Sequence, residues 1–263
     1  MIYSNEHDFL IIATPKTGST SVAAYLADSG LLKSTDVIIW DFPPIETGFN
    51  LQMTPGEKTY PHKTFIKDDQ NVFVRDPNLA RPTKTLPNAI PKSKDEPRLH
   101  LHSSYKDCLG LNLITENTSS YSNIRHPISR FLSSAGNYIN NPVNYGGDLS
   151  QSYNYRVSKA FDDLFAFATA EADRLMPLLL AKQSDFYGPN TVLWPVEYLN
   201  EAASAFITGM GGTVRGEWHL RDRQDTELPT WETTLSSETK NKILEKYPED
   251  LALWETTIQP YKA

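Results

Sequence analysis

The fold is decided by one stretch near the start of the chain, Phe9-Leu10-Ile11-Ile12-Ala13-Thr14-Pro15-Lys16-Thr17-Gly18-Ser19-Thr20-Ser21. Its first five residues form a continuous apolar run, which is typical of a short strand buried on both faces of a sheet. The apolar spacing of residues 22–27 predicts a helix, and Gly30 is placed to end it. We therefore expect a buried strand, a tight turn and a helix within this first part of the chain.

The turn between the strand and the helix, residues 14–21, has the composition of an anion-binding loop. The N–H groups at a helix start are unpaired within the helix and lie at the positive end of its dipole. Gly18 permits close approach of the backbone to a ligand, and Lys16 adds a positive charge. Three hydroxyl donors follow, from Ser19, Thr20 and Ser21. In the ordinary alternative, Ser19 only caps the helix and Lys16 is an exposed side chain.

The rest of the chain alternates between short apolar runs and segments with helical spacing. The apolar runs predict strands at residues 37–40, 120–124 and 191–194. The helical spacing predicts helices at residues 127–139, 161–176, 198–210 and 236–254. Because strand–helix alternation favours parallel pairing with crossover helices, we expect an α/β fold with a central parallel sheet flanked by helices. Residues 1–263 are expected to form a single domain.

The composition is that of an ordinary globular protein, with 263 residues, 39% hydrophobic and 22% charged. A formal net charge of −7 disfavours a general nucleic-acid binder, which normally carries a basic surface. A single cysteine, Cys108, cannot form an internal disulfide. Since we find neither a signal-peptide pattern nor an apolar run long enough to cross a membrane, we expect a soluble cytoplasmic protein with no membrane partner.

A proline-rich segment interrupts the alternation between Pro43 and Pro97, where nine of the 18 prolines lie. Proline removes a backbone donor and biases the preceding residue away from helix, so we expect a loop-rich insertion at residues 43–97. Residues 58–106 contain ten Lys or Arg against five Asp or Glu. This surplus indicates either a solvated basic loop or a wall that attracts an anionic ligand.

A second segment with phosphate-binding chemistry reads Ile124-Arg125-His126-Pro127-Ile128-Ser129-Arg130-Phe131-Leu132-Ser133. Arg125 stands at the predicted end of a strand, and Ser133 lies on the helix that follows. A guanidinium fork and a hydroxyl in these positions can converge on one phosphate. Taken alone, the two residues are more often an ordinary surface cation and an ordinary helix serine.

The two segments together closely resemble the nucleotide-binding signatures of sulfotransferases that use 3′-phosphoadenosine 5′-phosphosulfate, PAPS. This resemblance implies a P-loop-like three-layer sandwich, with PAPS as co-substrate and 3′,5′-adenosine bisphosphate as product. It assigns the 5′-phosphosulfate to the loop Pro15-Lys16-Thr17-Gly18-Ser19-Thr20-Ser21. It assigns the 3′-phosphate to Arg125 and Ser133, and the catalytic contact with the leaving phosphate to Lys16.

The resemblance is closest to the carbohydrate sulfotransferases, and it implies a glycan acceptor. Residues 192–199 are similar to the late strand of that family, and residues 246–254 to its closing helix. Golgi members carry a membrane anchor, so a chain without one resembles a soluble bacterial or viral relative. His126 stands where relatives usually carry Asp or Asn.

Sulfuryl transfer needs a base for the acceptor hydroxyl, and six histidines supply candidates. His100 and His102 flank Leu101, so alternation places both on one face of an expected strand, which is commonly just a polar face. The resemblance favours function, because glycan 2-O-sulfotransferases carry a His-Gly-His at this point and use a histidine base. We predict His102 as the base, His100 as its substrate-positioning partner, and Glu197 and Glu46 as reserve candidates.

Two other functions stay open from the sequence. A P-loop small-molecule kinase would use residues 37–41 as a strand ending in a magnesium-binding Asp41, although the order of Lys16 and Gly18 does not match the Walker A pattern. A non-catalytic nucleotide- or glycan-binding module would keep the loop and lack the base. No His or Cys cluster has metal-ligand spacing, so we predict no metal site. Tyrosine, lipid and small-alcohol acceptors stay open beside the glycan.

Overall fold

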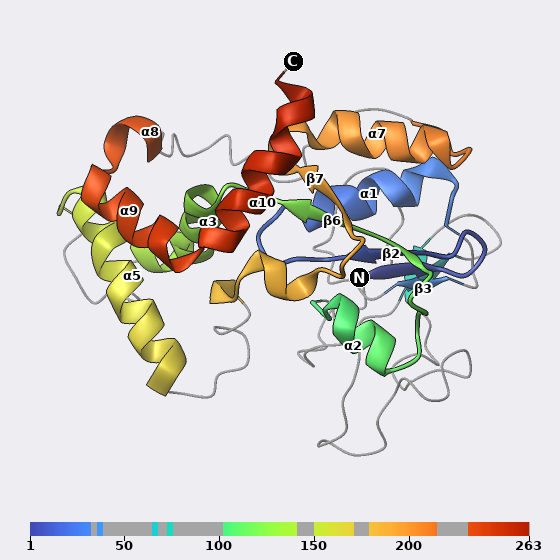
Figure 1. The fold of residues 1–263 in the computed structure, drawn as a ribbon, viewed down its shortest axis with the longest axis horizontal. Helices are drawn as coiled ribbons and strands as arrows, with labels where there is room; N and C mark the ends of the chain where they lie inside the picture. Colours follow the sequence, from blue (N-terminus) through green and yellow to red (C-terminus); the bar gives the residue numbers. More distant parts are fainter. Residues whose placement is uncertain are drawn as a thin grey trace. The chain divides into compact units, whose positions relative to one another are not determined.

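The computed structural model describes residues 1–32, 36–38, 65–67, 73–75, 102–140, 150–170, 179–214 and 231–262 (Figure 1). The chain divides into two compact units. The first unit comprises Met1–Thr14, Gly18–Asn123 and Phe186–Leu220. The second comprises Pro15–Thr17, Ile124–Asp185 and Arg221–Ala263.

A five-stranded sheet runs through the first unit in the order β3–β1–β2–β6–β7. Its strands are β1 (Ile2–Ser4), β2 (Phe9–Ile12), β3 (Val37–Ile38), β6 (Ser119–Ile124) and β7 (Val192–Pro195). β2 pairs in parallel with β6, so that Phe9 lies opposite Ser119 and Ile12 opposite Ser122. All four residues of β2 are buried, as the apolar run predicts.

One strand departs from the expected parallel sheet. β1 pairs antiparallel with both β2 and β3. Only residues 5–8 link β1 to β2, and so short a connection permits a hairpin but not the crossover that a parallel pair requires. The prediction of a wholly parallel sheet is therefore wrong at β1, whereas the mixed α/β class is confirmed.

The helices of the first unit are α1 (Ser19–Ser29), α2 (Tyr105–Gly110) and α7 (Leu199–Gly209). α1 ends at Gly30 as predicted, and the φ of 78° at this glycine is a left-handed conformation that side chains disfavour. α1 and α7 pack against each other (Figure 1). The ring of Phe206 on α7 lies 5.2 Å from that of Phe9 and 4.5 Å from that of Tyr121, which joins α7 to the sheet.

Helices make up most of the second unit. They are α3 (Pro127–Ile139), α5 (Tyr153–Ala170), α8 (Trp231–Thr234), α9 (Ser237–Lys246) and α10 (Pro248–Ile258), with 3-10 turns η1 (Gln183–Phe186) and η3 (Gln259–Tyr261) at segment ends. α3 begins and ends at the predicted residues, with Pro127 in its first turn. It packs with α5 and α9. The shared core consists of Ile128, Phe131, Ala135, Ile139, Val157, Ala160, Leu164, Leu180, Leu235, Ile243 and Tyr247.

The helix predicted at residues 236–254 is two helices. Ser236 caps α9, and its hydroxyl accepts a hydrogen bond from the N–H of Thr239 at 3.2 Å. α9 ends before Tyr247, whose φ of −128° and ψ of 50° are not helical. The cause is Pro248, because proline disfavours helical backbone in the residue before it yet fits the first turn of the next helix, α10.

Two further strands, β4 (Phe65–Lys67) and β5 (Phe73–Arg75), pair antiparallel in a separate sheet. The remainder of the predicted insertion at residues 43–97 lies outside the described residues. Within the part of the chain that the structure describes, no helix has both the length and the apolar composition needed to cross a bilayer.

Candidate functional site

The loop after β2, residues 14–21, contains two residues in the left-handed backbone region. Lys16 has a φ of 64° and Gly18 a φ of 74°. Glycine adopts this conformation at no steric cost, whereas for other residues it costs about 1–2 kcal/mol. Backbone strain of this kind collects at functional sites, so its presence at Lys16 marks the predicted catalytic lysine as a functional candidate.

No described side chain caps the start of α1. Gly18 is the N-cap residue, and its carbonyl accepts from the N–H of Ser21 at 2.9 Å. The alternative in which Ser19 caps the helix is therefore wrong, because Ser19 is the first helical residue. The first turn of α1 also contains no acidic residue. A helix start without a side-chain cap offers its N–H groups and positive dipole end to an anion. The side chain of Thr20 lies outside what the structure describes.

Two hydroxyl groups, one from the strand β6 and one from the loop itself, hold the point where the loop leaves β2. The Ser122 hydroxyl donates to the carbonyl of Ile12 at 2.9 Å, so its oxygen accepts the proton of the Thr14 hydroxyl, also at 2.9 Å. Thr14 is fully buried. A Cβ built on Gly18 would lie 3.6 Å from Leu199 and 3.7 Å from Val196, which is ordinary packing distance. The left-handed φ at Gly18, rather than lack of space, is therefore what requires glycine.

Two arginines contact the loop backbone on which Lys16 stands, and all these groups belong to the second unit. Nη1 of Arg125, the residue directly after β6, lies 3.5 Å from the carbonyl oxygen of Lys16. Nε of Arg130 on α3 donates to the carbonyl of Pro15 at 3.1 Å, and its Nη1 donates to Ala181 at 2.6 Å. The structure thus brings Arg125 to the loop segment 15–17.

Arg130 is a residue that the sequence analysis missed. Its side chain is only 2% exposed, although arginine is rarely buried without polar partners. Its partner Pro15 lies 115 residues away in the chain, so no local pattern announces the contact. Ser133 follows Arg130 by three residues and therefore shares its face of α3. Ser133 is half-buried, and its hydroxyl has no hydrogen-bond partner among the described residues.

His126, the residue directly after Arg125, caps the helix α3. Its Nδ1 accepts a hydrogen bond from the N–H of Ile128 at 3.2 Å, so the imidazole caps α3 as an Asp or Asn side chain would. The ring stacks on Trp231 and meets the edge of Trp254, each at 4.6 Å between centroids. Burial lowers the pKa of His126 to about 4, against a smaller opposing effect of Glu232. His126 is therefore neutral at pH 7.

His102 belongs to the first unit and lies beside the end of β2. Its Nδ1 is 2.5 Å from the carbonyl oxygen of Ala13. If Nδ1 carries the proton in this contact, Nε2 of the neutral ring is the acceptor, which is the state a general base needs. His102 occupies a turn rather than the expected strand, so the one-face argument for the histidine pair is wrong at this residue.

The turn at His102 leads into α2, which the sequence analysis did not predict. Ser104 and Asp107 form a capping box, in which the Ser104 hydroxyl accepts from the N–H of Asp107 at 3.2 Å and the carboxylate accepts from the N–H of Ser104 at 2.8 Å. This spacing was the available signal for a helix. The predicted partners His100 and Glu46 lie outside the described residues. Glu197 lies exposed in η2 (Val196–Tyr198).

Comparison of the chain with family models, curated proteins and solved structures returns no match. The interpretation of the site therefore comes from its own residues. Among the residues that the structure describes, no three His, Cys, Asp or Glu side chains gather as metal ligands would.

Proposed function

We propose that this chain is a PAPS-dependent sulfotransferase with a P-loop-like three-layer α/β architecture. One observation carries the proposal: Arg125 and Arg130 contact the backbone of the segment that bears Lys16. Two stretches that separately resemble the nucleotide signatures of one enzyme family are thereby neighbours. The uncapped start of α1 and the strained backbone of Lys16 add support from the loop itself.

In this proposal the loop Pro15 to Ser21 binds the 5′-phosphosulfate, and the donors are hydroxyls and the N–H groups from Lys16 onward, because Pro15 has no N–H. Arg125 and Ser133 bind the 3′-phosphate through a guanidinium fork and a hydroxyl. Recognition of the 3′-phosphate is what separates PAPS from ordinary adenine nucleotides.

The proposed reaction is an in-line displacement at sulfur. The acceptor oxygen forms a bond to sulfur while the bond from sulfur to the bridging phosphate oxygen breaks, and the electron pair leaves with 3′,5′-adenosine bisphosphate. The ammonium of Lys16 offsets the charge that develops on the leaving phosphate. Nε2 of His102 takes the proton of the acceptor hydroxyl. From the resemblance, we propose a glycan as the acceptor.

Thermal unfolding of the full chain with two ligands tests the nucleotide part of the proposal. Because a ligand stabilises the folded state it binds, 3′,5′-adenosine bisphosphate should raise the melting temperature and ATP with Mg²⁺ should not. The opposite result would favour a P-loop kinase and overturn the proposal.

Transfer of radiolabelled sulfate from PAPS tests the catalytic part. We expect labelled product with at least one acceptor from a panel of glycans, phenols and alcohols. Binding of the bisphosphate without transfer to any of them would indicate a non-catalytic binding module instead.

A further inference from the structure

The segment just before η1 is held almost entirely by side chains. The carbonyls of residues 179–181 accept hydrogen bonds from Ser134, Tyr247 and Arg130, at 3.1, 2.9 and 2.6 Å. Buried backbone groups must find such partners, and here they come from α3 and from the residue that separates α9 from α10. The position of this segment is therefore fixed on several sides within the second unit.

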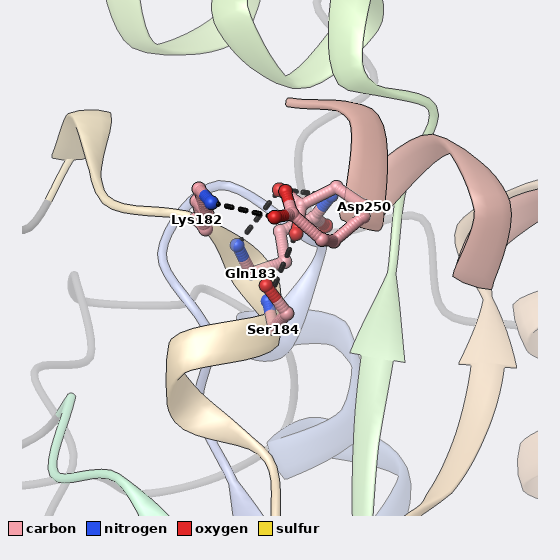
Figure 2. Close-up of polar contacts among 5 residues, drawn as sticks. Lys182, Gln183, Ser184 and Asp250 are labelled. Carbon is pink, nitrogen blue, oxygen red and sulfur yellow. Dashed lines mark hydrogen bonds and ion pairs between the residues drawn. The ribbon is translucent and has the colours of Figure 1, made fainter. Parts of the chain in front are cut away.

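A buried carboxylate fixes the next two residues. Asp250 of α10 is fully buried, and its oxygens accept from the N–H groups of Gln183 at 2.8 Å and Ser184 at 2.9 Å (Figure 2). Charge-assisted hydrogen bonds to a buried carboxylate are among the stronger ones in proteins. Asp250 thus fixes the backbone at the start of η1. The first residue of η1, Gln183, is itself fully buried.

The side chain of Gln183 pairs with the backbone of Arg125. Its Oε1 accepts from the N–H of Arg125 at 3.0 Å, and its Nε2 donates to the carbonyl of Arg125 at 2.9 Å. One amide group therefore satisfies both backbone groups of one residue, as a neighbouring strand would. This pairing occurs directly after the last residue of β6, where the sheet stops supplying partners.

We infer that Gln183, held by Asp250, is a positioning residue that sets the selectivity of the chain for a nucleotide 3′-phosphate. This inference rests on the proposed function, in which Arg125 binds that phosphate. An arginine side chain is long and flexible, so the direction of its guanidinium depends on a fixed backbone. Gln183 fixes that backbone through two hydrogen bonds without touching the nucleotide.

The test compares the affinities of the full chain for 3′,5′-adenosine bisphosphate and for 5′-AMP, measured by isothermal titration calorimetry. The wild-type chain should prefer the bisphosphate. Gln183→Met, which keeps the volume and removes both hydrogen bonds, should bind the bisphosphate about tenfold more weakly. Its affinity for 5′-AMP should change much less than its affinity for the bisphosphate, because in the proposal Arg125 contacts the backbone carbonyl of Lys16 in the 5′ loop and binds only the 3′-phosphate directly.

Two further variants keep the test decisive. Gln183→Asn keeps the amide but shortens the side chain by one methylene, which takes the amide away from the Arg125 backbone, and it should show the same selective loss if Gln183→Met does not fold. Lys182→Met removes only the neighbouring ion pair with Glu249, whose side chains are 40% and 55% exposed, and it should leave both affinities unchanged (Figure 2).

Three results would count against these ideas, and they are distinguishable. Wild-type values of both affinities in the Gln183 variants overturn the inference and leave the proposed function in place. An equal loss of both affinities shows a merely structural role and also overturns it. A wild-type chain without preference for the bisphosphate overturns the proposed function and, with it, the inference.

Discussion

The two strand–turn–helix junctions of the candidate site differ in how the first turn of the helix is capped. After β2, the backbone turns through left-handed residues at Lys16 and Gly18, and no described side chain caps α1. After β6, the imidazole of His126 caps α3, and Gln183 satisfies the backbone of Arg125. Both junctions join a buried strand to a helix, yet only the first leaves its helix start open to a ligand.

Under the proposed function, the two junctions would hold two phosphates by different means. The open junction after β2 offers backbone N–H groups, which suits a group that changes charge during a reaction. The closed junction after β6 offers only side chains on a fixed backbone, which suits a group that is recognised and left unchanged. Variants of each junction test whether the two junctions differ in this way.

The largest effect is expected from His102, which contacts the end of β2 at Ala13. His102→Ala should lower the turnover number by about 10²–10⁴-fold, because a positioned base is lost, while binding of 3′,5′-adenosine bisphosphate is unchanged. Steady-state kinetics and calorimetry measure the two properties. His7→Ala is the control, since His7 lies outside the loop. Near-wild-type turnover of His102→Ala would disprove the base assignment.

Two variants of Lys16 separate the effect of its positive charge on turnover from the effect of its left-handed backbone on stability. Lys16→Ala and Lys16→Gly should both lower the turnover number by about 10²–10³-fold, because each removes a preorganised cation. The glycine variant should be more stable than the alanine variant by about 1 kcal/mol in urea unfolding, since only glycine tolerates the left-handed backbone. Equal stabilities would show that the backbone at residue 16 is not strained in solution. Lys106→Ala, at an exposed position on α2, is the matched control for charge.

The closed junction should show a pH dependence of stability. The pKa of His126 is about 4 in the folded chain and about 6.5 in the unfolded chain, so protonation favours unfolding. The contribution of neutral His126 to the free energy of unfolding is fully present above pH 6.5 and is lost as the pH falls toward 4. Its upper limit is about 3 kcal/mol. His126→Asn should keep the cap and lose this pH dependence when urea unfolding is compared at pH 7 and pH 5. An identical pH profile in wild type and variant would contradict the buried neutral state.

The smallest effect is expected from the two glycines that flank α1. Their variants separate the effect of backbone strain from the effect on ligand binding. Gly18→Ala and Gly30→Ala each place a side chain at a φ near 75° and should each lower the unfolding free energy by about 1–2 kcal/mol. Only Gly18→Ala should also weaken binding of 3′,5′-adenosine bisphosphate, because Gly18 forms the helix start. Equal binding by the two variants would show that α1 does not contact the nucleotide.

The elements with strong local signals were predicted well from the sequence. Proline in the first turn and regular apolar spacing set the bounds of α3, and Gly30 marks the end of α1. The strand β1 was missed because three residues are too few to show a period. α2 was missed although Ser104 and Asp107 carry a capping signal, since the neighbouring histidines suggested a strand instead.

The sequence also supports a proposal for the residues that contact a ligand, but it does not indicate which residues hold them in place. Lys16 and Arg125 belong to motifs in which neighbouring residue types state the chemistry. Arg130 and Gln183 have partners 115 and 58 residues away, so their roles exist only once the chain has folded. A sequence can therefore indicate which groups meet a ligand more readily than which groups hold them in place.

The core of the second unit cannot be completed until late in the synthesis of the described chain. Leu235, Ile243 and Tyr247 complete the core that α3 and α5 begin. Because α3 and α5 are synthesised first, their apolar side chains stay exposed until residues 235–247 have been synthesised. A chain that stops before α9 would therefore expose these apolar side chains, which are the kind of surface that chaperones bind.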